Sequence, residues 1–195
     1  MVNSRRTIRD PFSSATIRLR PFRSDDMTGL QSILNDPSLV ARRYIPWMIP
    51  QRSPLSIRQV ESAVEDWEKR KKGFALAVEG RPSGCLAGYC ECNWDWDPHC
   101  PSLSVVIAPM DQLRGLGSAV MELLLSYLFE QTPAHNVNGW IDDWNSEGLA
   151  FAEAMGFRRT GTVPRVGMKD GRYVDGVLVD ILRSEWREGG AGHGA

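Results

Sequence analysis

The spacing of apolar residues along the chain predicts a series of strands and helices. Residues 16–20 alternate between apolar and basic, which indicates a strand. Two amphipathic helices should follow: Ser24 caps the first, and Ser53-Pro54 opens the second with a proline at its first helical position. The apolar runs 74–79 and 86–92 are separated by turn residues and predict a β-hairpin.

The second half of the chain contains the strongest helical pattern. Apolar residues recur on one helical face from Leu116 to Leu128. A shorter helix should begin after Asn145, a good capping residue, and end at Gly156. The strands that we expect in this half are residues 103–108, 137–141, 157–163 and 177–181. The order β-α-α-β-β-β-α-β-α-β-β predicts the α/β (α+β) class, with helices on both faces of a mixed sheet.

Length and composition favour one globular domain. The chain has 195 residues, of which 42% are hydrophobic and 24% are charged, as in an ordinary folded domain. Its formal net charge of −1 lacks the positive excess that is typical of nucleic-acid-binding proteins, so we expect no nucleic-acid partner. We place the domain at residues 15–187, between an N-terminal tail of residues 1–14 and a flexible, glycine-rich tail of residues 188–195.

The sequence favours a cytoplasmic location. No apolar stretch approaches the roughly 20 residues that span a bilayer, so we expect no membrane partner. The basic N-terminus lacks the apolar segment of a secretory signal, and the four cysteines should therefore be reduced thiols. The cysteines and His99 lack the Cys-x-x-Cys spacing of a zinc site, so we expect no metal.

The segment from Val105 to Ser118 carries the most informative pattern. A strand runs into a loop that holds Gly115 and Gly117, and the loop runs into the long helix. The first N–H groups of a helix lack backbone partners and lie at the positive end of its dipole, which suits a pyrophosphate. Taken alone, the pattern also fits a plain tight turn, and its spacing differs from those of P-loop and dinucleotide-binding motifs.

Three separated motifs resemble one family. The stretch Gln112-Leu113-Arg114-Gly115-Leu116-Gly117 matches the Gln/Arg-x-x-Gly-x-Gly/Ala signature of the GNAT superfamily of acyl-CoA N-acyltransferases. Asn145 and Gly156-Phe157 stand at the family spacing Asn-x10-Gly-Phe. The segments 170–175 and 182–186 look like those of the RimJ/RimL branch. The resemblance covers about residues 15–187 and implies a mixed, mostly antiparallel sheet of about seven strands.

The resemblance also implies which residues bind the acyl donor, acetyl-CoA. The backbone of Val105, Val106 and Ile107 would hold the acyl and pantetheine portion where two strands splay apart. The glycine loop would bind the pyrophosphate, so a bulky side chain at Gly117 should obstruct it. The other residues implied are Gln112, Leu113, Arg114, Gly115, Leu116, Ser118 and Asn145.

Three positions depart from the family pattern. The tyrosine that acts as the acid for the leaving thiolate falls on Ala152, and a usual serine falls on Gly148. The glutamate at the start of the fourth strand falls on Ser102, which leaves the base open. Candidate bases near the motif are Glu91, Asp142, Asp143 and His99. Each carboxylate also fits a solvated or capping role, and a relayed water is an alternative to all of them.

Aromatic residues mark two candidate acceptor regions. Trp94 and Trp96 alternate with aspartates, a composition that suits a cationic amine through charge and cation–π attraction. Tyr44 and Trp47 lie in the region that caps the acceptor cleft of GNAT proteins. The alternative is a surface loop whose tryptophans pack on the core.

Together, the motifs and the resemblance predict an N-acetyltransferase. It would move the acetyl group of acetyl-CoA to a primary amine, on a small molecule or a protein N-terminus, by direct attack in a ternary complex. The alternative is a non-catalytic acyl-CoA-binding sensor or interaction domain, because the usual acid and base positions hold Ala152 and Ser102. The sequence leaves open whether the protein forms a homodimer.

Overall fold

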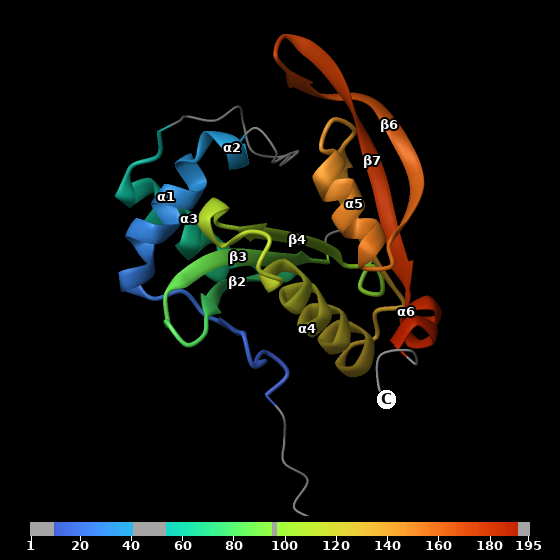
Figure 1. Ribbon diagram of the computed structural model, residues 1–195, viewed down its shortest axis with the longest axis horizontal. Helices are drawn as coiled ribbons and strands as arrows, with labels where there is room; N and C mark the ends of the chain where they lie inside the picture. The colour runs from blue at the N-terminus through green and yellow to red at the C-terminus, as the bar shows by residue number, and fades with distance from the viewer. Residues whose placement is uncertain (1–9, 41–53, 95–96, 191–195) are drawn as a thin grey trace, which may run out of the picture.

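The computed structural model describes residues 10–40, 54–94 and 97–190. Its centre is a seven-stranded sheet in the order β1-β2-β3-β4-β5-β7-β6 (Figure 1). The strands are β1 (Ile17–Arg20), β2 (Gly73–Gly80), β3 (Leu86–Asn93), β4 (Ser102–Ile107), β5 (Asn136–Asp142), β6 (Arg158–Lys169) and β7 (Arg172–Leu182). Every neighbouring pair is antiparallel except β4 and β5, which are parallel. The predicted fold class is confirmed.

Helices cover both faces of this sheet, as the sequence predicts. Helices α1 and α3 pack on one face, against Tyr89 and Val106. Helices α4 and α5 pack on the other face, against Val137 and its neighbours (Figure 1). The helices are α1 (Met27–Asn35), α2 (Pro37–Val40), α3 (Ile57–Glu68), α4 (Leu116–Gln131), α5 (Ser146–Ala154) and α6 (Arg183–Gly190), with 3-10 turns at η1 (Ser24–Asp26) and η2 (Pro109–Asp111).

The alternation of strand residues decides which side chains reach which helices. In β3, Cys90 and Cys92 face α4, whereas Tyr89 faces α3 and stacks on Trp67 with ring centroids 5.3 Å apart. Glu91 therefore lies on the α1/α3 face. All four cysteines are free, and burial raises the pKa of the Cys90 thiol to about 12, so this thiol stays protonated.

Several boundaries differ from the sequence prediction. Helix α3 begins at Ile57 rather than at Ser53-Pro54, because the Ser56 hydroxyl accepts a hydrogen bond from the Gln59 N–H and the Gln59 side-chain oxygen accepts one from the Ser56 N–H. Ser24 opens a 3-10 turn and makes no side-chain cap to α1.

Both predicted tail boundaries also shift. Phe12, placed in the N-terminal tail by sequence, packs against Tyr127 with ring centroids 4.9 Å apart, and its carbonyl accepts a 2.7 Å hydrogen bond from Leu19. At the other end, α6 runs to Gly190, three residues beyond the expected domain end at 187. Within the described ranges, no helix is both long and apolar enough to cross a membrane.

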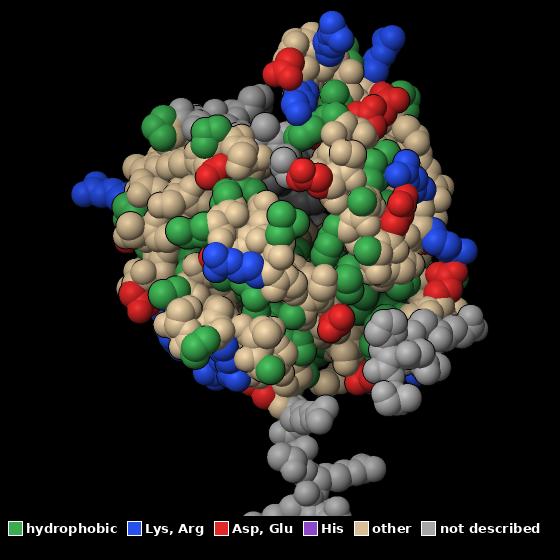
Figure 2. All heavy atoms as spheres, viewed as in Figure 1, with side chains coloured by type: hydrophobic (Ala, Val, Ile, Leu, Met, Phe, Trp, Pro, Cys, Tyr) green, Lys and Arg blue, Asp and Glu red, His purple; other side chains and the backbone are tan. Residues whose placement is uncertain are grey.

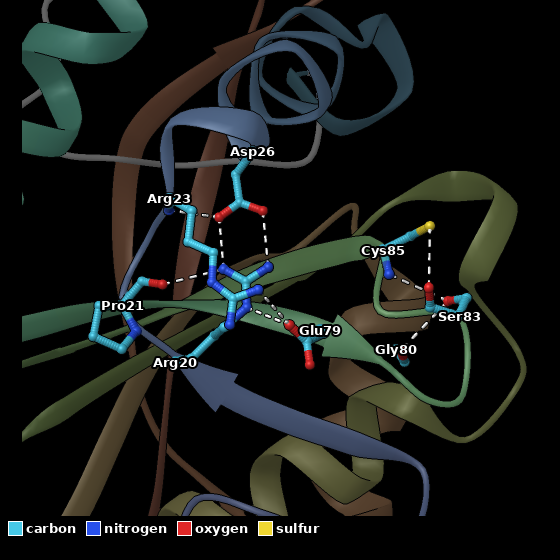
Figure 3. Close-up of polar contacts among 8 residues, drawn as sticks. All are labelled: Arg20, Pro21, Arg23, Asp26, Glu79, Gly80, Ser83 and Cys85. Carbon is cyan, nitrogen blue, oxygen red and sulfur yellow. Dashed lines mark hydrogen bonds and ion pairs between the residues drawn. The ribbon is translucent and has the colours of Figure 1, made fainter.

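An ion-pair network joins β1, β2 and η1 (Figure 3). Arg20 is 5% exposed, holds Asp26 through two hydrogen bonds of 2.6 and 2.9 Å, and bonds Glu79 at 2.5 Å. Burial alone would raise the pKa of Asp26, but the Arg20 guanidinium and the Arg23 N–H outweigh it and hold that pKa below its usual value. The network fixes the start of α1 to the sheet edge.

Candidate active site

Strands β4 and β5 separate almost at once. They share a single register pair, Ser102 with Asn138, next to a hydrogen bond of 3.0 Å from the Asn138 N–H to the Pro101 carbonyl. Beyond that point β4 continues to pair with β3 on its other side, up to Ile107 opposite Gly88. Among the described residues, one edge of β4 from Leu103 to Ile107 is therefore left without a strand partner.

The alternation of backbone groups shows which β4 residues face this gap. The Ala108 N–H donates to the Ala87 carbonyl of β3 at 2.8 Å. In an antiparallel ladder the direction of these groups alternates, so the backbone groups of Val106 also point to β3, while those of Val105 and Ile107 point into the gap. The Gln112 side chain donates to the Ile107 carbonyl at 3.0 Å and ties the following loop to the end of β4.

The gap leads to the N-terminus of α4. Gly115 precedes the helix with φ of 76°, a left-handed conformation that glycine adopts without strain, and its carbonyl accepts from the Ala119 N–H at 3.1 Å. Helix α4 has no side-chain cap, and within the described part of the chain no backbone N–H of residues 113–118 donates a hydrogen bond. Free N–H groups and the positive end of the helix dipole are features that suit an anion.

The two loop glycines have different surroundings. A Cβ atom at Gly115 would meet nothing within 4 Å, so this position faces open space. A Cβ atom at Gly117 would lie 3.5 Å from the ring of Phe151 and 3.8 Å from Ile107. The sequence predicts an obstruction of the phosphate site at Gly117, whereas the structure directs a side chain there against Phe151 and Ile107. A larger side chain there would act through packing.

Asn145 caps α5, as predicted. Its Oδ1 atom accepts a 3.0 Å hydrogen bond from the Gly148 N–H. A Cβ atom at Gly148 would lie 2.5 Å from the Asn145 amide nitrogen, so the glycine leaves room for this orientation of the amide. Ala152, at the family's tyrosine position, is 5% exposed and packs in the core. It offers no proton to a leaving group.

Glu91 is buried but paired. It is 8% exposed, and its Oε2 atom accepts a 2.7 Å hydrogen bond from Arg70, which also reaches Asn93 at 3.1 Å. Its register partner on β4 is Ser104, an exposed residue. Glu91 therefore lies one strand away from the gap, with one oxygen held by a guanidinium.

Asp142 is equally buried and lacks a cationic hydrogen-bond partner among the described residues. It lies at the end of β5 and is 8% exposed. Its Oδ2 atom accepts a 3.2 Å hydrogen bond from Trp144 Nε1. Its Oδ1 atom is buried and has no hydrogen-bond partner in the described ranges. Burial raises the pKa of Asp142, and the nearby Asp143 raises it further. Since Val137 and Ile141 face α5, Asp142 lies on the opposite face, the one that carries Glu91. Asp143 itself is exposed and donates its N–H to the Asp175 carbonyl at 2.9 Å.

A family model described as an acetyltransferase (GNAT) domain matches residues 16–158. The chain belongs to the GNAT acetyltransferase family. It is therefore an acetyl-CoA-dependent acetyltransferase, as predicted from its motifs.

Curated GNAT relatives span most of the chain. The L-methionine sulfoximine/L-methionine sulfone acetyltransferase of Pseudomonas aeruginosa is 26% identical over 156 residues, which cover 77% of this chain and 85% of the relative. An N-acetyltransferase of Streptomyces griseus is 25% identical and covers 95% of this chain and 94% of its own length. Among solved structures, spermidine N-acetyltransferase from Vibrio cholerae in complex with CoA and spermine gives a TM-score of 0.76 at 19% identity, over 89% of this chain and 99% of that one. This last likeness confirms the GNAT fold.

The predicted acceptor residues are only partly placed. Tyr44, Trp47 and Trp96 lie outside the described residues. Trp94 is half-buried against the core and packs on Phe74 with ring centroids 5.9 Å apart. Its position is explained by packing, so we do not carry it into the acceptor site.

Two contacts near the candidate bases had no signal in the sequence. The first is Arg70, which stands 21 residues before Glu91 and pairs with it in space. The second is Lys169, whose Nζ lies 3.3 Å from the centroid of the Trp144 ring. Lys169 belongs to the tip of the β6–β7 hairpin, where Lys and Arg side chains gather (Figure 2).

Proposed function

We propose that this protein transfers the acetyl group of acetyl-CoA to a primary amine by direct attack in a ternary complex. The observation that carries the proposal is the β4–β5 gap, which opens beside the uncapped N-terminus of α4. Acetyl-CoA supplies an activated thioester. The gap offers the backbone groups of Val105 and the N–H of Ile107 for the pantetheine, since the Ile107 carbonyl already accepts from Gln112. The N–H groups of residues 113–118 suit the pyrophosphate.

Arg114 adds positive charge to the proposed pyrophosphate site. Its side chain is 67% exposed and lies 3.3 Å from the half-buried Asp111, a pair that water screens on the arginine side. Asn145 would approach coenzyme A from the first turn of α5. Leu113, Leu116 and Ser118 would contribute through their backbone N–H groups.

Asp142 is the base that we favour. A primary ammonium with an ordinary pKa near 10.4 must lose a proton before it can attack. A base works best when its pKa lies close to the working pH, and burial moves the pKa of Asp142 in that direction. Its Oδ1 atom is buried and has no hydrogen-bond partner among the described residues, so it is the oxygen left to take up the proton. Glu91 is the second candidate, because Arg70 already occupies one of its oxygens.

The leaving thiolate needs no acid from this chain. Ala152 replaces the tyrosine and carries no proton. Because a thiol has an ordinary pKa of about 8.5, its thiolate is a tolerable leaving group near neutral pH. The missing acid is therefore compatible with catalysis.

The acceptor that we propose is an α-amine, on an amino-acid-like small molecule or a protein N-terminus. Two observations support this class: the relative from Pseudomonas aeruginosa is named for amino-acid derivatives, and the C-terminal motifs resemble the RimJ/RimL branch. We retain the RimJ/RimL assignment and a homodimer as parts of the proposal.

The test is release of free thiol from acetyl-CoA against a panel of amines. The panel contains L-methionine sulfoximine, free amino acids, spermidine and short peptides with free N-termini. We expect α-amines to accelerate thiol release well above the rate without amine. A preference for spermidine over every α-amine would overturn the acceptor class, and no acceleration by any amine would overturn the proposed function.

A further inference from the structure

Three residues from separate elements meet at the end of β5. Asp142 closes the strand, Trp144 lies in the turn before α5, and Lys169 ends β6. The Trp144 indole N–H donates to Asp142 Oδ2 at 3.2 Å, and the Lys169 ammonium lies over the same ring, 3.3 Å from its centroid. The indole thus contacts the carboxylate through its edge and the ammonium through its face.

This arrangement is stable on electrostatic grounds. A cation over an indole face is attracted by the ring's negative quadrupole, and tryptophan is the best of the aromatic residues for this interaction. The indole N–H is a donor only, so its sole polar function is to serve an acceptor such as a carboxylate. Trp144 and Lys169 are both half-buried, which reduces screening by water.

The charged groups around Asp142 come from three elements. Asp143 follows it in the chain and opposes its ionisation, whereas Lys169 on β6 favours it. Asp175 on β7 is engaged elsewhere: its carbonyl accepts from Asp143, and its Oδ1 accepts from the Arg165 N–H at 2.9 Å. Among the described groups, Trp144 and Lys169 therefore favour the charged form of Asp142 against burial and Asp143.

We propose that Trp144 and Lys169 are positioning residues for Asp142: Trp144 orients the carboxylate and favours its ionised form, and Lys169 anchors the indole from the β6–β7 hairpin. The proposal rests on the function proposed above, with Asp142 as the base. Because Oδ2 is held by Trp144, Oδ1 is the oxygen left for the proton of the amine. Lys169, which lies just before the motif segment 170–175, would thereby link the hairpin tip to the base.

Two variants separate the roles. Trp144→Phe removes the N–H donor and keeps an aromatic face for Lys169, and Lys169→Met removes the ammonium and keeps an apolar stem. Trp186→Phe is the matched control, because Trp186 packs on Phe129 with ring centroids 5.6 Å apart. Lys69→Met is the second control, because Lys69 is 69% exposed and pairs with Glu65.

The first readout is titration of the Asp142 carboxyl carbon by ¹³C NMR, assigned with Asp142→Asn, which needs no amine acceptor. We expect the midpoint to move to higher pH in Trp144→Phe and, by less, in Lys169→Met, because each loses a group that favours the carboxylate. The second readout is the pH profile of kcat/KM for thiol release. The acidic limb of this profile should also move to higher pH in both variants. At a fixed pH on that limb, kcat/KM should therefore fall roughly five- to tenfold in Trp144→Phe.

The outcomes are distinct. If the midpoint of the Asp142 titration stays at the wild-type pH in both variants, the proposal is overturned, whatever the acetyltransferase activity of the variants. A moved midpoint with an unmoved rate limb would also overturn it, since Asp142 would then be no base. Lys169→Arg should restore the wild-type profile, because it restores a cation over the ring. Failure of the wild-type protein to acetylate any amine would instead overturn the proposed function. The NMR titration would still decide whether Trp144 and Lys169 control the protonation of Asp142.

Discussion

Replacing Asp142 by Asn should stabilise the protein and disable it. The folded state holds Asp142 at 8% exposure with Oδ1 unpartnered in the described ranges, and its pKa is raised by burial. A carboxyl whose pKa is higher in the folded than in the unfolded state binds protons more tightly when folded. Stability from this group therefore falls as the pH rises from the unfolded value of about 3.9 through the folded value.

The size of the gain follows from the buried oxygen. A buried polar group without a partner costs about 1–3 kcal/mol, and more when it is charged. Asn keeps an oxygen for Trp144 and removes the charge, but it leaves an amide N–H₂ in the same place. We expect a net gain of about 1 kcal/mol near neutral pH, since part of the penalty remains. For a chain of this size that raises Tm by about 2–4 °C.

The assay compares stability and rate in one variant. Thermal unfolding followed by circular dichroism should show the gain at pH 8 and its decline toward pH 4. Thiol release should fall by roughly 10² to 10⁴, while the Kd for acetyl-CoA stays unchanged, because a general base acts in the transition state.

Glu91→Gln is the matched comparison, and we expect its change in stability to have the opposite sign. It breaks the 2.7 Å pair with Arg70 and should lower stability by about 1 kcal/mol, with less than a tenfold change in rate. An Asp142→Asn protein that is less stable at pH 8, or that keeps its rate within tenfold, would refute the reasoning about Asp142.

Three further predictions concern the donor site and the fold. Acetyl-CoA at a hundredfold excess over its Kd should stabilise the protein by about 2.7 kcal/mol in thermal unfolding, and an unchanged Tm would contradict the donor site. In a calorimetric titration, Gly117→Ala should keep the wild-type affinity for acetyl-CoA, because its Cβ would meet Phe151 at an ordinary 3.5 Å. Gly117→Val should weaken acetyl-CoA binding, because its larger side chain would press on Phe151 and Ile107. Equal affinities of the two variants would exclude that packing effect. Arg20→Met should lower the free energy of unfolding by about 3–5 kcal/mol at pH 7 in denaturant unfolding, because it leaves the buried Asp26 carboxylate without its guanidinium. That loss of stability should shrink as the pH falls and Asp26 protonates. A loss of stability that is independent of pH would contradict the ion-pair account.

The parts of the fold that depend on local pattern could be predicted from the sequence. Helix α4 has a regular apolar stripe, and Leu124 and Leu128 are fully buried in it. The strand–loop–helix around Gly115 was also predictable, because a left-handed turn before a helix calls for glycine. Both signals lie within a few residues of the structure that they specify.

The β6–β7 hairpin shows why other boundaries were missed. Its strands run for 12 and 11 residues, but the sequence indicated only residues 157–163 and 177–181. Most residues toward the tip are exposed, Met168 and Tyr173 included, and the register shifts between Val163 and Gly167, so no alternation of buried apolar residues marks the strands there. The pairing partner, rather than the local pattern, decides the length of this hairpin.

The start of α3 was missed for a different reason. Proline at a first helical position is a good signal, and Ser53-Pro54 supplied one. The competing signal, Ser56 followed three residues later by Gln59, was also present in the sequence and forms the capping box that the structure contains. The two reciprocal hydrogen bonds of the capping box satisfy two free N–H groups at the helix start, whereas a proline only removes one N–H group. This difference accounts for the start of α3 at Ile57.

The candidate bases show what a sequence cannot distinguish. Glu91 and Asp142 are both carboxylates near the ends or centres of strands, and both are 8% exposed. Their chemistry differs because of partners that are remote in the chain: Arg70 approaches Glu91 from the end of α3, and Lys169 approaches Trp144, the partner of Asp142, from the end of β6. A buried carboxylate held by a guanidinium is satisfied as an anion, whereas one held by a single neutral donor keeps a free oxygen and a reason to accept a proton. The same burial thus makes one residue structural and the other reactive, and this difference is why we assign the proton transfer to Asp142.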